Sequence, residues 1–418
     1  MTRALVVFED RRWSGLRPLT EFAPVPALWL GDTTLAGRWM RVASAPLLAI
    51  EARGDALALW RDRPAPDPRA SAASEVLAAN AAALPGPWLD AALKGREPAL
   101  LVAQGRIAAA RIPAARVGGA AGLGGDLEAR LEALDLPRVE VAAEFLDHPW
   151  QLVERNAERL VADLSASKAE HRGEVHRLAC LENPGAIAIG EGARIEAFAV
   201  LDARAGPIRI ERGARVAAHT VVTGPCLVGE GTELLGGSVA RSTLGPQCRI
   251  AGEVEESVWQ GWSNKRHHGF VGHSLVGEWV NLGALTTTSD LKNNYGAVRV
   301  WIEGAERDTG LQKVGAFLGA HVKTGIGTLL PTGASVGMGS NLFGGGRFAP
   351  RRMPPFSWWD GEREVEHRLE AFLETARHAM ARRQRPMSAA EERALRACAA
   401  AGAAERAAGM ARSAAAAS

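Results

Sequence analysis

IERGARVAAHTVVTGPCLVGEGTELLGG, residues 210–237, places an aliphatic side chain at every sixth position. These positions are Ile210, Val216, Val222, Val228 and Leu234. A period of six fits neither the 3.6 residues of a helical turn nor the two of a β-strand. It fits a solenoid with three short flat faces per coil, in which each face turns one side chain inward and glycine serves the tight corner. The segment is therefore predicted to form part of a stacked wall of short strands.

The same spacing extends through residues 185–360. Its further members are Ile189, Ile195, Leu201, Leu244, Ile250, Val276, Leu282, Leu318, Leu330, Val336 and Leu342. The count of six fails at about residues 252–270 and 291–315, and insertions in a solenoid leave the coil as loops, often at the binding face. A β-sandwich with regular turns is the alternative interpretation.

The flanking segments have other patterns. Residues 1–175 read as a mixed α/β domain, with strands expected at RALVVFED (3–10) and PALLVAQGRIAAARI (98–112) and a helix at 149–172. Residues 361–418 read as a helical extension with an Ala-rich tail, and Ser388 with Glu391 forms a capping box. The sequence thus predicts three domains, at 1–175, 185–360 and 361–418.

Bulk composition excludes several classes of function. The chain has 418 residues and a net charge of +2 from 49 basic and 47 acidic residues, which gives no general reason to bind nucleic acid or an anionic membrane. No apolar run is long enough to span a bilayer. The four cysteines are scattered without a CxxC pair, so we expect no metal site of that kind, no disulfide framework, and a cytoplasmic location.

Polar chemistry is concentrated in residues 261–298, GWSNKRHHGFVGHSLVGEWVNLGALTTTSDLKNNYGAV. This segment holds two adjacent histidines, two lysines, four asparagines and the only tyrosine of the chain. It lies between and within the two breaks of the six-residue count. We therefore expect the functional groups where loops leave the wall.

This segment resembles the left-handed β-helix acyltransferases, in particular the acetyltransferase half of the bifunctional glucosamine-1-phosphate acetyltransferase and N-acetylglucosamine-1-phosphate uridyltransferase family. Residues 263–284, LKNNY at 291–295 and PPFSWW at 354–359 are similar to a bacterial branch described as sugar nucleotidyltransferases. The resemblance covers roughly residues 1–360. It implies an α/β nucleotidyltransferase-like domain, a left-handed parallel β-helix and a homotrimer with acyl-CoA bound between neighbouring coils.

The resemblance also implies roles for single residues. His267 matches the general base that takes a proton from the attacking sugar amine, a step that suits histidine because it titrates near neutral pH. Asn281 and Ala284 match positions beside the acetyl-CoA thioester. The residues implied to meet the substrate are Asn264, Lys265, Lys292, Asn293, Asn294 and Tyr295. The loop asparagine and tyrosine of the better-known family correspond to Asp290 and Leu291 here.

Other histidines and tryptophans of this region are open to a structural reading. A single histidine on a solenoid is more often structural than catalytic. His268 and His273 are nevertheless alternative bases, and His321 in GAHVKTGIG (319–327) is a candidate for facing a CoA groove. Packing is the expected role of Trp259, Trp262 and Trp279.

The N-terminal segment GLRPLTEFAPVPALWLGDTTLAGRW, residues 15–39, resembles sugar-1-phosphate nucleotidyltransferases. That chemistry needs a glycine-rich phosphate loop and Mg²⁺, yet residues 9–15 contain one glycine and Arg106 stands where the family has a metal-binding aspartate. Arg11, Arg12 and Arg17 are possible substitutes for the nucleotide-binding arginine. Mg²⁺ is therefore expected only if this domain is active, and a degenerate or purely binding domain is an alternative.

The sequence as a whole predicts a transferase. The expected reaction is transfer of acetyl from acetyl-CoA to an amino sugar phosphate or amino sugar nucleotide, for precursors of the UDP-N-acetylglucosamine type. One alternative is an active sugar-1-phosphate nucleotidyltransferase with a structural β-helix. The other is a non-catalytic trimeric scaffold or sugar-nucleotide sensor.

Overall fold

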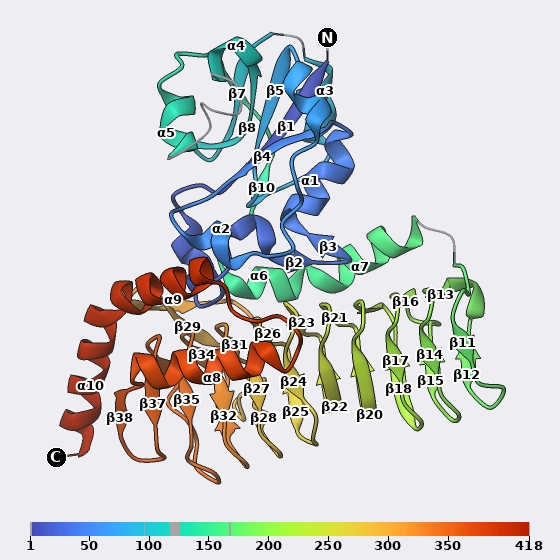
Figure 1. Cartoon of the computed structure of the whole chain (residues 1–418), viewed down its shortest axis with the longest axis vertical. Coiled ribbons are helices and arrows are strands. Elements are labelled where there is room, and N and C mark those ends of the chain that lie inside the picture. Colours follow the sequence, from blue (N-terminus) through green and yellow to red (C-terminus); the bar gives the residue numbers. More distant parts are fainter. Residues whose placement is uncertain (1, 96, 118–125, 167–168, 418) are drawn as a thin grey trace. The chain divides into compact units, whose positions relative to one another are not determined.

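The computed structural model describes residues 2–95, 97–117, 126–166 and 169–417 (Figure 1). The chain folds into two compact units. Unit 1 comprises Met1–Leu16, Ala23–Leu28 and Thr33–Asp147, and unit 2 comprises Arg17–Phe22, Trp29–Asp32 and His148–Ser418. Within the described residues, no helix combines the length and the apolar character that crossing a membrane requires.

Unit 1 is built on a mixed six-stranded sheet of order β4-β1-β5-β8-β7-β9. The strands are β1 (Arg3–Phe8), β4 (Leu47–Glu51), β5 (Glu75–Asn80), β7 (Ala99–Ala103), β8 (Arg106–Pro113) and β9 (Arg138–Glu140). β1 runs parallel to β4 and β5, and β7 runs parallel to β9, while β8 is antiparallel to both of its neighbours. The predicted strands at 3–10 and 98–112 are therefore confirmed.

Short helices accompany this sheet. They are α1 (Leu35–Ala43), α2 (Ala56–Leu59), α3 (Trp88–Lys94), α4 (Ala114–Val117) and α5 (Leu127–Glu132), and a further small sheet joins β6 (Ala83–Leu84) to β10 (Glu144–Phe145). Trp39 of α1 is fully buried, meets Trp88 edge to face, and donates its indole N–H to the Ala83 carbonyl at 3.1 Å. A buried indole needs such an acceptor, so this contact fixes α1 on the core.

Unit 2 contains a parallel β-helix whose short strands stack in three columns (Figure 1). The first column is β11 (Glu174–Val175), β14 (Arg194–Ile195), β17 (Arg215–Val216), β20 (Glu233–Ala240), β22 (Arg249–Glu255), β24 (Asn264–Lys265), β27 (Asn281–Leu282), β32 (Lys323–Thr324), β35 (Asn341–Leu342) and β37 (Ser357–Trp359). The second is β13 (Ile187–Ile189), β16 (Ile208–Ile210), β19 (Cys226–Val228), β21 (Thr243–Leu244), β23 (Val258–Trp259), β26 (Leu275–Val276), β31 (Phe317–Leu318), β34 (Ser335–Val336) and β36 (Arg352–Met353). The third contains β12 (Cys180–Glu182), β15 (Val200–Asp202), β18 (Thr220–Thr223), the ends of β20 and β22, β25 (Phe270–Gly272), β28 (Thr287–Thr288) and β33 (Leu329–Leu330).

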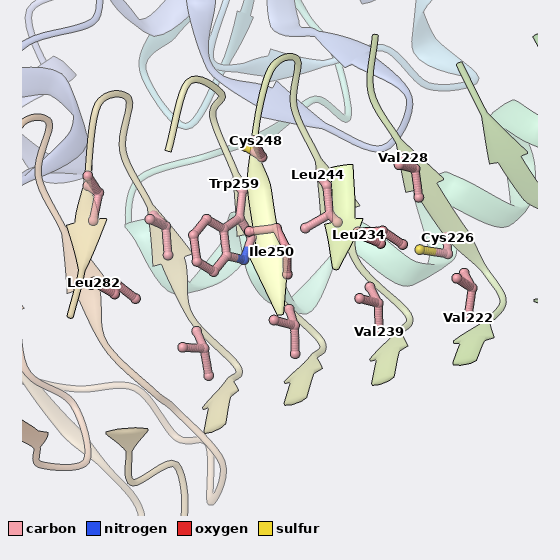
Figure 2. Packing of buried hydrophobic residues seen from close by; sticks show 14 of the residues in the cluster. Val222, Cys226, Val228, Leu234, Val239, Leu244, Cys248, Ile250, Trp259 and Leu282 are labelled. Atoms are coloured by element: carbon pink, nitrogen blue, oxygen red, sulfur yellow. The ribbon is translucent and has the colours of Figure 1, made fainter. Parts of the chain in front are cut away.

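The predicted aliphatic ladder is the core of this β-helix. Figure 2 shows Val222, Val228, Leu234, Leu244 and Ile250 pointing into one continuous apolar interior. Each of these side chains is almost fully buried, so the six-residue period marks inward positions as predicted. The predicted fold class, an α/β domain followed by a parallel β-helix and helices, is confirmed.

The two breaks in the six-residue count have different outcomes. Residues 291–315 leave the coil as predicted and contain an antiparallel hairpin of β29 (Arg299–Ile302) and β30 (Ala305–Asp308). The prediction of a loop at 252–270 was wrong, because this segment continues the coil. The step from Arg249 to its neighbour Asn264 is 15 residues, against 18 from Arg215 to Glu233, so the coil shortens at its corners and the sequence period is lost.

Helices complete unit 2. They are α6 (Pro149–Glu154), α7 (Asn156–Ser165), α8 (Leu369–Ala381), α9 (Ala389–Ala401) and α10 (Ala403–Ala417). The predicted helix at 149–172 is divided at Arg155. The predicted capping box of Ser388 and Glu391 begins α9. α8 buries Phe372, Leu373, Ala376 and Met380.

Candidate functional site

A groove of about 620 Å³ lies between the first strand column and helix α8. Its strand side presents Arg249, Asn264, Asn281 and Lys323, which occupy one register position on β22, β24, β27 and β32. Its other side consists of Thr375, His378 and Ala379 of α8 and of Arg382 and Arg383, which directly follow α8. Asn264 and Asn281, which the sequence analysis named as site residues, both line this groove. The side-chain amide of Asn264 donates a hydrogen bond to the side-chain oxygen of Asn281 at 2.8 Å.

The groove is strongly cationic. Five of its described lining residues are basic and none is acidic; the basic ones are Arg249, Arg266, Lys323, Arg382 and Arg383. Burial lowers the pKa of Lys323 to about 8, and burial together with the nearby Arg249 lowers the pKa of Arg383. Glu233 pairs with Arg249 at 3.0 Å from outside the lining. Clustered guanidinium groups with so little internal neutralisation are suited to phosphate groups, which they bind through bidentate hydrogen bonds.

One wall of the groove is an aromatic column at a corner of the β-helix. Trp262 stacks on Trp279 at 5.1 Å, and Trp279 stacks on His321 at 6.1 Å between ring centroids. All three have φ near +60°, a left-handed conformation that costs a non-glycine residue about 1 kcal/mol. The equivalent corner carries glycine in several other coils, as at Gly231 and Gly339.

The rings of this column are occupied by neighbours. The Arg385 guanidinium lies over the Trp262 ring at 4.4 Å, and Trp279 stacks on the same ring. Trp262 therefore has the packing role that the sequence analysis expected. His321 is 1% exposed and meets Phe22 and Phe372 edge to face. Neither of its ring nitrogens has a hydrogen-bond partner within the described chain, and burial lowers its pKa well below the ordinary value. His321 was a candidate for a CoA groove, but it lies behind Trp279 and not in the lining.

His267 lies on the short loop after β24, next to Arg266 of the groove, and its side chain is exposed. The buried Lys265 side chain contacts the backbone of this loop. It occupies an inward position, is 1% exposed, and donates from Nζ to the carbonyl oxygens of Ala251 at 2.9 Å and His267 at 2.8 Å. Burial lowers the pKa of Lys265 to about 8. The prediction put this ammonium at a sugar phosphate, whereas the structure places it inside the β-helix as an anchor for the His267 backbone.

The other two histidines of the motif differ in their contacts. His268 is exposed, and its carbonyl accepts from the Leu285 N–H at 2.9 Å. His273 places Nδ1 2.8 Å from Oδ2 of Asp290, and this contact lowers the pKa of the carboxyl group. A carboxylate that orients an imidazole is a common arrangement for a general base. His273 with Asp290 is therefore a second candidate for that role.

The remaining predicted residues lie outside the groove lining. Lys292, Asn293, Asn294 and Tyr295 form a loop shortly after Asp290, with the Lys292 ammonium 2.5 Å from the Ala297 carbonyl oxygen and Tyr295 65% exposed. Ala284 is half-buried, and its carbonyl accepts from Gly327 at 2.8 Å. Within one chain, the predicted substrate residues therefore divide between the groove, the β-helix interior and the loop beside His273.

The three arginines predicted to meet a nucleotide are separated by the division into units. Arg17 belongs to unit 2, and Arg11 and Arg12 belong to unit 1. Arg11 pairs with Asp126 at 2.7 Å and with Glu132 at 3.5 Å, and the hydrogen bond to Asp126 raises its pKa. Arg12 is exposed.

Comparisons with known proteins agree with the resemblance over part of the chain. Residues 5–172 match the sugar nucleotidyl transferase family. A bifunctional sugar-1-phosphate nucleotidylyltransferase/acetyltransferase of Sulfurisphaera tokodaii is 37% identical over 22% of this chain and 23% of its own length. The bifunctional protein GlmU of Methanococcus aeolicus is 33% identical over 21% of each chain.

The chain thus matches about a fifth to a quarter of the length of these curated relatives. A solved UDP-N-acetylglucosamine acyltransferase aligns with 50% of this chain and 76% of its own at 13% identity and a TM-score of 0.24. The matched family and the curated relatives are transferases by name, in agreement with the class of enzyme predicted from the sequence.

Proposed function

We propose that unit 2 transfers an acetyl group from acetyl-CoA to the amine of an amino sugar phosphate or amino sugar nucleotide. The observation that carries this proposal is the basic groove that adjoins the His267 loop through Arg266. In this proposal residues 185–360 form the transferase domain, residues 361–418 contribute the α8 wall, and residues 1–175 form a nucleotidyltransferase-like domain.

The groove suits the donor in charge and size. Acetyl-CoA carries several phosphate charges, and the five basic side chains offer both guanidinium forks and the Lys323 ammonium to them. Its volume of about 620 Å³ lies within the range of ordinary small-molecule sites. Asn281, proposed to lie beside the thioester, lines the same groove.

The reaction requires one base. The free amine attacks the thioester carbonyl, a C–N bond forms, the C–S bond breaks, and the CoA thiolate leaves. His267 removes the proton that the attacking nitrogen loses, and the thiolate takes up a proton. Lys265 keeps the His267 backbone in place through its 2.8 Å hydrogen bond and acts as a positioning residue.

We further propose that the protein is a cytoplasmic homotrimer. The β-helix carries large apolar side chains that are more than half exposed, among them Leu285, Ile326, Phe343 and Phe348. Contiguous exposed apolar patches mark interaction surfaces, and this proposal assigns these four side chains to the interface between subunits. Light scattering coupled to size-exclusion chromatography tests the assembly, and a monomeric mass would contradict it.

A second candidate function is sugar-1-phosphate nucleotidyl transfer by unit 1, which the family match of residues 5–172 favours. Ligand-dependent thermal stability separates the two, because a ligand that binds the folded state raises Tm. We expect acetyl-CoA to raise Tm of the wild type and to lose most of this effect in the Arg382→Ala/Arg383→Ala variant. Stabilisation by UTP or dTTP that needs Mg²⁺, with none by acetyl-CoA, would support the second function instead.

A further inference from the structure

Four polar residues of unit 1 meet at the carboxyl edge of its sheet. Asp10 follows β1, Asn80 ends β5, Arg106 begins β8, and Asp147 follows β10. Asp10, Asn80 and Arg106 are each less than 5% exposed. The carboxyl ends of parallel strands are where open α/β sheets bind their ligands. This cluster is therefore at the expected place for a functional centre of unit 1.

The Arg106 guanidinium lies between the two carboxylates. Its Nη2 is 2.5 Å from Oδ2 of Asp10, its Nε is 3.1 Å from the same oxygen, and its Nη1 is 2.5 Å from Oδ1 of Asp147. The Phe145 ring covers the guanidinium at 3.9 Å. Arg106 thus places a positive charge between the two carboxylates.

Asp10 accepts four hydrogen bonds, three of them at Oδ2. Oδ2 accepts from Asn80 Nδ2 at 2.9 Å in addition to the two Arg106 donors, and Oδ1 accepts from the Arg12 backbone N–H at 3.1 Å. Each carboxylate oxygen offers about two lone pairs, so Oδ2, with three donors, has none left for a metal ion, and Oδ1 has one donor.

Mg²⁺ therefore does not fit this centre. Nucleotidyl transfer relies on a divalent cation held by carboxylates against the phosphates, and here a guanidinium already lies between the two carboxylates of this centre. The Arg106 guanidinium thus offsets one of the two carboxylate charges at this edge.

We infer that the Arg106 guanidinium takes the place of a divalent cation in unit 1. This centre then works without a metal ion, and it can bind a metal cation only when the guanidinium is removed. It follows that a nucleotide-type ligand of unit 1 binds without a divalent cation. The inference concerns unit 1 alone and does not depend on acyl transfer by unit 2.

Mn²⁺ binding to the full chain, measured by electron paramagnetic resonance, tests this inference. The wild type and Asp10→Asn should bind the same number of Mn²⁺ ions, because the wild type has no Mn²⁺ site at Asp10. Arg106→Ala should gain one Mn²⁺ site, and the Asp10→Asn/Arg106→Ala double variant should lose it. Mn²⁺ should also raise Tm of Arg106→Ala and leave Tm of the wild type unchanged.

Two results would overturn the inference. The first is a wild-type Mn²⁺ site that disappears in Asp10→Asn, because the carboxylates would then hold a metal beside Arg106. The second is a folded Arg106→Ala chain, judged by circular dichroism, that gains no site. If Arg106→Ala does not fold, the wild type and Asp10→Asn still decide between the two outcomes.

Discussion

Lys265 offers a quantitative test of the β-helix interior, through the substitution Lys265→Met. Burial lowers its pKa from the ordinary 10.5 to about 8, a difference that corresponds to about 3 kcal/mol. Above pH 8 the folded chain releases this proton while the unfolded chain holds it to about pH 10.5. The free energy of unfolding of the wild type should therefore rise with pH across this window by about 3 kcal/mol from Lys265.

Lys265→Met removes this contribution while keeping an unbranched side chain in the core. We expect the stability of the variant relative to the wild type to fall by about 3 kcal/mol between pH 7 and pH 10.5. Lys323, whose pKa is also lowered to about 8, contributes equally to both chains and cancels in the difference.

Urea denaturation followed by circular dichroism at a series of pH values measures this difference. Lys94→Met, at an exposed lysine, is the matched control and should follow the wild type at every pH. Parallel stability curves for the wild type and Lys265→Met would refute the reasoning, since they would show that the Lys265 ammonium is not desolvated by folding.

Two further predictions concern the β-helix. Trp259→Ala empties a fully buried position of the core in Figure 2 and should lower the free energy of unfolding by about 3–5 kcal/mol, measured by urea denaturation; a cost below about 1 kcal/mol would contradict the packing. The hydrogen bond to His273 favours the Asp290 carboxylate and lowers its pKa, so this contact stabilises the folded wild type at neutral pH. Asp290→Asn should therefore lower the stability at neutral pH, and the difference from the wild type should vanish as the pH falls through the lowered pKa of Asp290. Thermal unfolding from pH 7 to pH 2 checks this, and a wild-type and variant difference that does not shrink toward low pH would contradict it.

The sequence predicted the β-helix because inward positions of a regular coil repeat in chain order. Trp259 and Lys265 escaped this pattern, since they lie in a coil of 15 residues and Lys265 is a polar residue at an aliphatic position. The aromatic corner had a detectable signal. Trp262 and Trp279 stand two residues before Asn264 and Asn281, the spacing at which Gly231 precedes Glu233.

The groove itself could not be found from local sequence. Arg382 and Arg383 reach it only because α8 packs beside strands more than a hundred residues earlier in the chain. The Arg106 centre has the same origin. The sequence showed that an arginine replaces an expected aspartate, but only the fold brings Asp10 and Asp147 to the two sides of its guanidinium.

Acetyl-CoA turnover by His267→Ala tests the central proposal most directly. The assay follows thiol release with glucosamine-1-phosphate and a panel of amino sugars, and His268→Ala, at the adjacent exposed histidine, tests the alternative base. We predict a loss of roughly 100-fold or more in turnover for His267→Ala, with circular dichroism unchanged and His268→Ala close to the wild type. Full turnover by His267→Ala would contradict this account and direct the search for the base to His273 and Asp290.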